Sequence, residues 1–143
     1  MMAAINTVTG YIEFATKGDA DIIDITGEVS DAVSESGVTD GIVVVFAPGA
    51  TGAVTTIEYE SGLISDFKSM LERIAPQNIT YAHNLRWGDG NGHSHVRASL
   101  LGPSLSVPLI DGRMQLGTWQ QIIFIDLDNR PRDRKLIVQI VGD

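Results

Sequence analysis

The sequence predicts a single compact α+β domain over residues 1–143, with about two helices on one face of a sheet and a carboxyl-terminal half that is mostly β-sheet. Two segments carry apolar residues at helical spacing, and about seven short runs are rich in β-branched and aromatic residues. No internal repeat or linker interrupts the 143 residues. A chain of this length forms one domain that buries roughly two thirds of the surface exposed by its unfolded form.

In the amino-terminal half, "TGYIEFAT" (9–16), "GIVVVFAP" (41–48) and "GAVTTIEYE" (52–60) predict strands, because they are β-rich and bounded by glycine, proline or polar residues. The segment 21–37 predicts a helix that starts at Asp24 or Thr26 and stops at Gly37. Its apolar stripe comprises Ile25, Val29, Ala32 and Val33. The segment 61–76 predicts a second helix, with Ser61 as its cap, Pro76 as its terminator and an apolar stripe of Leu63, Phe67, Met70, Leu71 and Ile74.

From His93 onward the pattern predicts strands over 93–102, 105–110, 113–117, 121–128 and 135–142. Asp111-Gly112 separates two of these runs, and this dipeptide favours the positive φ angles of a two-residue type I′ hairpin turn. The segment 128–134, "DNRPRDR", predicts another turn, whose interleaved arginines and aspartates favour a solvated, self-neutralising surface over the alternative of an anion site.

Composition restricts the class of function. A net charge of −8 argues against nonspecific binding of nucleic acid, since such binding requires cations that neutralise phosphates. No apolar run approaches the ~20 residues of a membrane span, and the first residues do not resemble a signal peptide, so we expect a cytoplasmic protein without a membrane partner. The chain has no cysteine, so histidine and carboxylate are its only strong metal ligands.

All three histidines lie between His83 and His95. If 93–102 is a strand, His93, His95, Arg97 and Ser99 share one face, while Val96, Ala98 and Leu100 share the other. Two imidazoles on one strand face can point at one metal ion, and His83 can supply a third ligand. We therefore expect a divalent metal such as zinc, or a substrate, at His83, His93 and His95. The alternative is that these are ordinary surface histidines.

The loop "WGDGNGH" (87–93) has glycine at 88, 90 and 92, which allows backbone N–H groups to approach a ligand. It matches neither the dinucleotide-binding pattern nor the calcium-loop pattern, and a tight connecting turn is the alternative. Asp89 in this loop and Glu58 after the third strand are candidates for a general base or an extra ligand.

The run 94–142, with "SHVRASLLGPS" and "LGTWQ", together with 41–60, resembles the YjbQ family, also called the secondary thiamine-phosphate synthase enzyme family. The resemblance implies a small α+β protein, a homotrimer and a weak thiamine-phosphate synthase activity. In that reaction a pyrimidine diphosphate is joined to a thiazole phosphate with loss of pyrophosphate.

The resemblance also carries over individual residues. The family's histidine before asparagine falls on His83-Asn84, its later histidine and basic residue on His95 and Arg97, and its glutamate on Glu58. Many members read Pro-His-Thr-Thr where this chain has Pro48-Gly49-Ala50-Thr51, so one histidine of the usual cluster is absent. In "LGTWQ", Trp119 is predicted to be a packing anchor, and the alternation of a strand would turn its two neighbours toward the site.

The leading hypothesis is a trimeric, transferase-like enzyme that binds a small phosphorylated metabolite. Arg97 would neutralise phosphate, and Glu58 or Asp89 would position water or move a proton. The substrate-binding candidates are Thr51, Asn84, Thr118 and Gln120. The alternatives are a trimer that binds a metal or a small anion without turnover, and a metal-dependent hydrolase.

Overall fold

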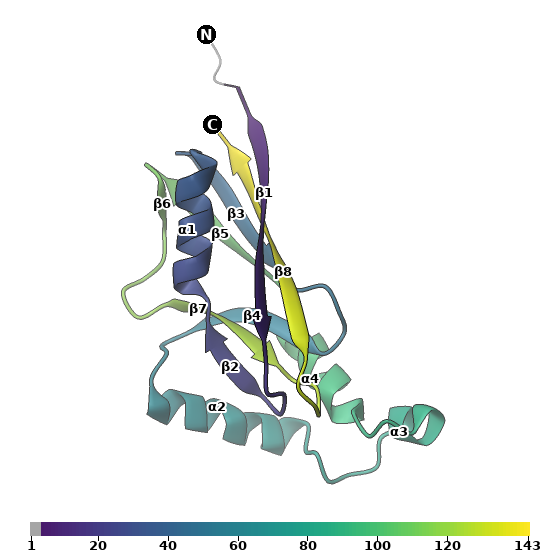
Figure 1. Ribbon diagram of the computed structural model, residues 1–143. Helices are drawn as coiled ribbons and strands as arrows, with labels where there is room; N and C mark the ends of the chain where they lie inside the picture. The colour runs from purple at the N-terminus through teal and green to yellow at the C-terminus, as the bar shows by residue number, and fades with distance from the viewer. Residues whose placement is uncertain (1–3) are drawn as a thin grey trace.

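The computed structural model describes residues 4–143, which form two antiparallel sheets and four helices (Figure 1). The strands are β1 (Asn6–Ala15), β2 (Asp21–Asp24), β3 (Gly41–Phe46), β4 (Gly52–Ile57), β5 (Ser104–Ile110), β6 (Arg113–Met114), β7 (Gln121–Asp126) and β8 (Asp133–Gly142). The helices are α1 (Thr26–Ser36), α2 (Ser61–Ile74), α3 (Ala82–Trp87) and α4 (Gly92–Leu101). None of the helices in residues 4–143 is both long and apolar enough to cross a membrane.

The α+β class is confirmed, but the strands are distributed along the whole chain rather than gathered in its carboxyl-terminal half. The larger sheet has the order β1-β8-β3-β5-β6, and the smaller sheet has the order β2-β7-β4. Half of the strands precede α2, and the longest ladder pairs β1 with β8 from opposite ends of the chain. Figure 1 shows these two strands side by side along the length of the molecule.

Strand β7 separates two apolar cores, because its successive side chains point to opposite faces. Ile122 and Phe124 join a core between the two sheets that also contains Val29 of α1. Ile123 and Ile125 join a second core that includes residues of α2 and α4. The helices therefore pack on both faces of the smaller sheet, and the prediction that they share one sheet face is wrong.

Helix α1 follows its predicted apolar stripe, and Gly37 ends it in the left-handed conformation at φ 71°. It begins at Thr26, the later of the two predicted starts, because residues 21–24 pair with β7 as strand β2. Asp24 stabilises the helix start, where its Oδ1 accepts a hydrogen bond from the backbone N–H of Thr26 at 3.0 Å. In α2 the cap is Glu60 rather than Ser61, since its carboxylate accepts from the N–H groups of Gly62 and Leu63.

The predicted strand 93–102 is wrong: this segment forms α4. The alternation of polar and apolar residues fits a strand, but Ser94, Arg97 and Ala98 also recur at helical spacing. These three side chains are buried on the side of α4 that faces the body of the domain, whereas Val96 and Leu100 are exposed. Packing of this segment against β4 therefore favours the helix over the predicted strand.

The Asp111-Gly112 hairpin is confirmed, with φ angles of 51° and 75° and Ile110 paired with Arg113. We predict that Gly112→Val lowers the free energy of unfolding by more than about 1 kcal/mol, because a β-branched residue is strained at positive φ. A Cβ atom at Gly112 would meet no atom within 4 Å, so the expected loss of stability would come from backbone strain and not from a steric clash.

The matched control is Gly27→Val, which also places a side chain in open space but in a helix, where valine is tolerated better than glycine. Urea denaturation of both variants measures the difference. Equal midpoints for Gly112→Val and the unaltered protein would contradict the prediction.

Candidate functional site

His83, His95 and Asp89 form a polar cluster where α3, the following loop and α4 meet. The imidazole rings of His83 and His95 have their centroids 4.5 Å apart, with an angle of 39° between their planes. His83 Nδ1 lies 3.5 Å from Asp89 Oδ1. Two of the predicted metal ligands and one predicted carboxylate are therefore brought together, and we call them the His83–His95–Asp89 cluster.

The loop between α3 and α4 positions this cluster. Gly88 ends α3 in the left-handed conformation, and Asn84 Oδ1 accepts a hydrogen bond from the N–H of Gly92 at 2.8 Å. A Cβ atom on Gly92 would lie 2.6 Å from Tyr81 Cβ, so only glycine allows α4 to start this close to α3. The glycine-rich loop thus serves as the tight connector that the sequence left as an alternative, and Asn84 stabilises it.

Two small pockets each include one residue of the His83–His95–Asp89 cluster. His95 lines a pocket of about 170 Å³ together with Gly49, Ala50 and Ser99. Asp89 lines a pocket of about 260 Å³, which we call the Asp89 pocket and whose other walls are Asn91, Asn129, Arg130 and Arg132. Gly49, the position at which many family members have histidine, faces the same pocket as His95. The arrangement offers two binding volumes with imidazole and carboxylate groups between them.

A buried ionic network lies behind the Asp89 pocket, and it corrects part of the prediction for 128–134: Arg130, Pro131 and Asp133 are exposed as expected and the arginines pair with aspartates, but two of those aspartates are buried. The side chains of Asp126 and Asp128 are fully buried. Arg134 donates to Asp126 through Nε at 2.8 Å and through Nη2 at 2.9 Å. The strands that flank this turn belong to different sheets, so the turn is not a hairpin.

Thr51 and Asn91 make hydrogen bonds to this ionic network, and Asn91 also lies next to Asp89 of the cluster. Thr51 Oγ1 donates to Asp128 Oδ2 at 3.1 Å and accepts from Arg134 Nη2 at 2.9 Å. The amide of Asn91 lies between two carboxylates, with its nitrogen 3.3 Å from Asp128 Oδ1 in one orientation and 3.0 Å from Asp89 Oδ1 in the other. Burial raises the pKa of Asp128, but hydrogen bonds led by that of Arg132 outweigh this effect and lower the pKa to about 2.

His93 and Arg97 are not part of the His83–His95–Asp89 cluster. His93 is 2% exposed, and residues two apart on a helix point in different directions, so its ring is directed away from His95. Burial lowers the pKa of His93, and the nearby charge of Arg97 lowers it further. Arg97 is also buried, where Nε donates to the carbonyl of Ala75 at 2.9 Å and Nη2 binds Glu72 at 2.7 Å.

These contacts tie α4 to the end of α2. Within residues 4–143, no three histidine, aspartate or glutamate side chains are placed so that they could hold one metal ion. The three predicted histidine ligands therefore do not converge in a single copy of the chain.

Glu58, Thr118 and Gln120 lie at the opposite end of β4 from the cluster. Gly52, at the start of β4, contributes to the pocket that contains His95. Gln120 Nε2 donates to Thr56 Oγ1 at 3.2 Å, close to the other end of the strand. A strand advances about 3.3 Å per residue, so roughly 17 Å separates the two ends of β4. One copy of the chain thus divides the predicted site residues among at least three locations: the His83–His95–Asp89 cluster, the buried contacts of His93 and Arg97, and the far end of β4.

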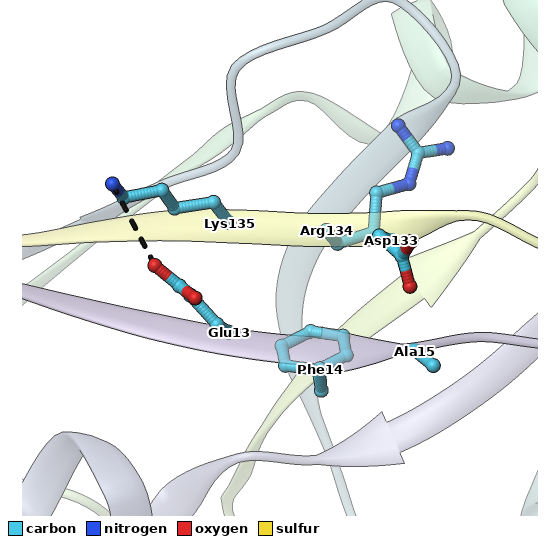
Figure 2. Close-up of a pocket in the computed structure, with 6 residues that line it drawn as sticks. All are labelled: Glu13, Phe14, Ala15, Asp133, Arg134 and Lys135. Carbon is cyan, nitrogen blue, oxygen red and sulfur yellow. Dashed lines mark ion pairs between the residues drawn. The ribbon is translucent and has the colours of Figure 1, made fainter.

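A larger pocket, of about 430 Å³, lies along β1 and β8, and Figure 2 shows the residues that line it. Lys135 and Glu13 form an exposed ion pair across these strands at 3.6 Å, and Phe14 packs edge-on against Phe124. The guanidinium of Arg134 points away from Asp133 and is already bound to Asp126. No histidine lines this hollow. The smaller pockets beside the His83–His95–Asp89 cluster are therefore the better candidates for a site that needs an imidazole as acid, base or ligand.

Sequence reasoning missed the ionic network and the amides at its surface. A signal was present, since Asp126 and Asp128 follow a strongly apolar run and Arg132 and Arg134 follow the next turn at the same spacing. Residues two apart on a strand share a face, so each pair points to one side. The charges were assigned to solvent because the sequence does not reveal that Thr16 and Thr51 meet Asp126 and Asp128 there.

The family model described as UPF0047 protein YjbQ-like matches residues 10–143. A UPF0047 protein of Methanothermobacter thermautotrophicus is 44% identical over 134 residues, which cover 94% of this chain and 92% of the relative. A crystal structure from Sulfolobus solfataricus, described as a YbjQ-like protein of unknown function, matches with a TM-score of 0.93 and 30% identity over 98% of this chain and 100% of that one. A hypothetical protein from Aeropyrum pernix matches with a TM-score of 0.88 and 32% identity over 95% and 99%.

Proposed function

The chain belongs to the UPF0047 family of YjbQ-like proteins, and from this premise we propose that it is a homotrimeric enzyme that acts on a small phosphorylated metabolite. The observation that carries the proposal is the His83–His95–Asp89 cluster between two pockets. Two adjacent binding volumes suit a group transfer between two small molecules. The family resemblance favours a transfer in which pyrophosphate leaves.

His83 is the proposed proton donor. When both ring nitrogens of His83 carry a proton, Asp89 can accept a hydrogen bond from Nδ1–H, and Nε2–H can donate its proton or a hydrogen bond to a departing phosphate oxygen. The 3.5 Å separation is long for a hydrogen bond, and such contacts often shorten when substrate binds. Stabilising the negative charge on a leaving phosphate lowers the barrier to its departure. His95 lies against His83 and would orient its ring.

The second candidate is a trimer that binds a metal or a small anion without turnover. The close approach of two imidazoles to each other favours it, because neutral imidazoles bind zinc and similar ions. A screen of phosphorylated metabolites, singly and in pairs, tests the enzyme against this alternative. Product formation supports the enzyme. Binding without product, with stoichiometric metal in protein purified without chelator, would replace the enzyme by the binding protein.

Two apolar patches at opposite ends of β4 support the proposed trimer. Val96 and Leu100 are exposed on α4, and Tyr59 and Trp119 are exposed near the other end. In a ring of three copies, one patch of each copy packs on the other patch of its neighbour. This arrangement would bring Glu58, Thr118 and Gln120 of one copy toward the His83–His95–Asp89 cluster of the next.

We expect light scattering at micromolar concentration to give the mass of three chains. Leu100→Glu should shift the mass toward that of a monomer, because a charge in an apolar interface must be desolvated. Since Leu100 is exposed in one copy, this change should leave the circular dichroism spectrum unaltered. A monomer mass for the unaltered protein would exclude the trimer.

A further inference from the structure

We propose that the Asp89 pocket is an anion subsite that binds the phosphate or diphosphate group of the substrate, chiefly through Arg130 and Arg132. The inference rests on the proposed function, because it names the part of the site that recognises the phosphorylated substrate. It replaces Arg97, whose guanidinium is committed to Glu72 and Ala75, as the predicted phosphate ligand.

Arg132 is held in place before any ligand binds. Its Nε and Nη2 lie 2.9 Å and 2.7 Å from the same oxygen of Asp128, Oδ2. The Asp128 carboxylate is itself fixed by Thr51 and by the backbone N–H of Asn129. The side chain of Arg132 is 36% exposed, so it retains N–H groups for a partner in the pocket. A guanidinium that is already oriented loses less conformational entropy when it binds phosphate.

Arg130 supplies a positive charge that offsets the carboxylate of Asp89 in the pocket lining. Its side chain is exposed, and within residues 4–143 it makes no ion pair. Asp128 neutralises Arg132, so Arg130 decides whether an anion is attracted to the pocket. This local charge matters because the chain as a whole carries a net charge of −8 and repels anions at long range.

Two asparagines complete the pocket and connect its walls. Asn129 Nδ2 donates to the backbone carbonyl of Asp89 at 3.0 Å, which ties the turn after β7 to the loop before α4. Asn91 borders the pocket with its amide between Asp89 and Asp128. Amide N–H groups are neutral donors that can complete the hydrogen bonding of a phosphate oxygen.

The presence of Asp89 restricts the substrate class. A carboxylate repels a phosphate but accepts hydrogen bonds from hydroxyl or amino groups. The pocket therefore fits a phosphomonoester or diphosphate whose organic part carries such a donor close to the phosphate. Asp89 also contacts His83, so a phosphate held by Arg130 and Arg132 would lie beside the proposed proton donor.

Calorimetric titration of the intact protein with inorganic phosphate and with pyrophosphate tests the subsite. We expect Arg130→Gln to weaken binding by about tenfold or more, since charge-assisted hydrogen bonds contribute about 1.5–3 kcal/mol. Arg130→Lys should retain part of the affinity, because it keeps the charge but loses the paired geometry. Arg113→Gln is the matched control, since Arg113 is an exposed arginine on β6, outside this pocket.

The outcomes of these experiments show whether the subsite proposal or the proposed function fails, because each can fail without the other. Unchanged phosphate affinity in Arg130→Gln, or no saturable binding of either anion by the unaltered protein, would overturn the subsite. The proposed function would still stand if the metabolite screen gave product. A loss of affinity in Arg130→Gln but not in Arg113→Gln supports the subsite, even if no metabolite is turned over and the enzymatic proposal fails.

Discussion

Asp126→Ala is expected to lower the free energy of unfolding by about 3–5 kcal/mol, the cost of breaking a buried ion pair by removing one partner. Asp126 is fully buried, and Arg134, which binds both of its oxygens, is 11% exposed. Alanine would leave this guanidinium without a counter-charge and with only part of its hydrogen bonding, through Thr51. Urea denaturation followed by circular dichroism measures the loss.

Glu13→Ala is the matched control for that experiment. Glu13 also pairs with a cation of β8, but its ion pair with Lys135, drawn in Figure 2, is largely exposed. Exposed ion pairs contribute about 0–1 kcal/mol, so this variant should be nearly as stable as the unaltered protein. Equal losses in the two variants would contradict the account of a buried network.

His83→Gln is expected to reduce turnover by about 100-fold or more, which is the usual contribution of a positioned acid or base. Glutamine keeps a hydrogen-bond donor at this position but cannot transfer a proton at neutral pH. Asp89→Asn should have a smaller effect, because the proposed role of Asp89 is to hold the His83 ring. The measurement is the initial rate with the metabolite that the screen identifies.

Arg113→Gln serves as the control for the turnover measurement as well, and it should leave the rate unchanged. His83 is on the short surface helix α3 and is not part of either apolar core, so His83→Gln should melt at nearly the same temperature as the unaltered protein. A folded His83→Gln variant that keeps its full rate would remove His83 from the mechanism.

Much of the sheet could be predicted from the sequence, because local signals specify it. The runs 41–48 and 121–128 are β-rich and apolar, and both contain strands of the structure. Asp111-Gly112 determines its turn through its own backbone preferences. Strand β2 was missed because its four residues precede α1 directly and form a strand only by pairing with β7.

Helix α4 could not be predicted because two periodicities fit the same residues. A spacing of two places His93, His95 and Arg97 together, whereas helical spacing places His93 with Arg97 and turns His95 elsewhere. The second arrangement is found, with His93 and Arg97 buried and His95 beside His83. His83, His95 and Asp89 still lie in one region because all three belong to one short stretch of chain, whereas His93, which was predicted to join the two other histidines, does not.

A crystal structure of the protein soaked with the metabolite found by the screen would show directly where the substrate binds. We expect the phosphate to lie in the Asp89 pocket, in contact with Arg130 and Arg132, and the reacting atom to lie within hydrogen-bonding distance of His83. A metabolite bound instead in the hollow between Glu13 and Lys135, with the His83–His95–Asp89 cluster untouched, would contradict this expectation.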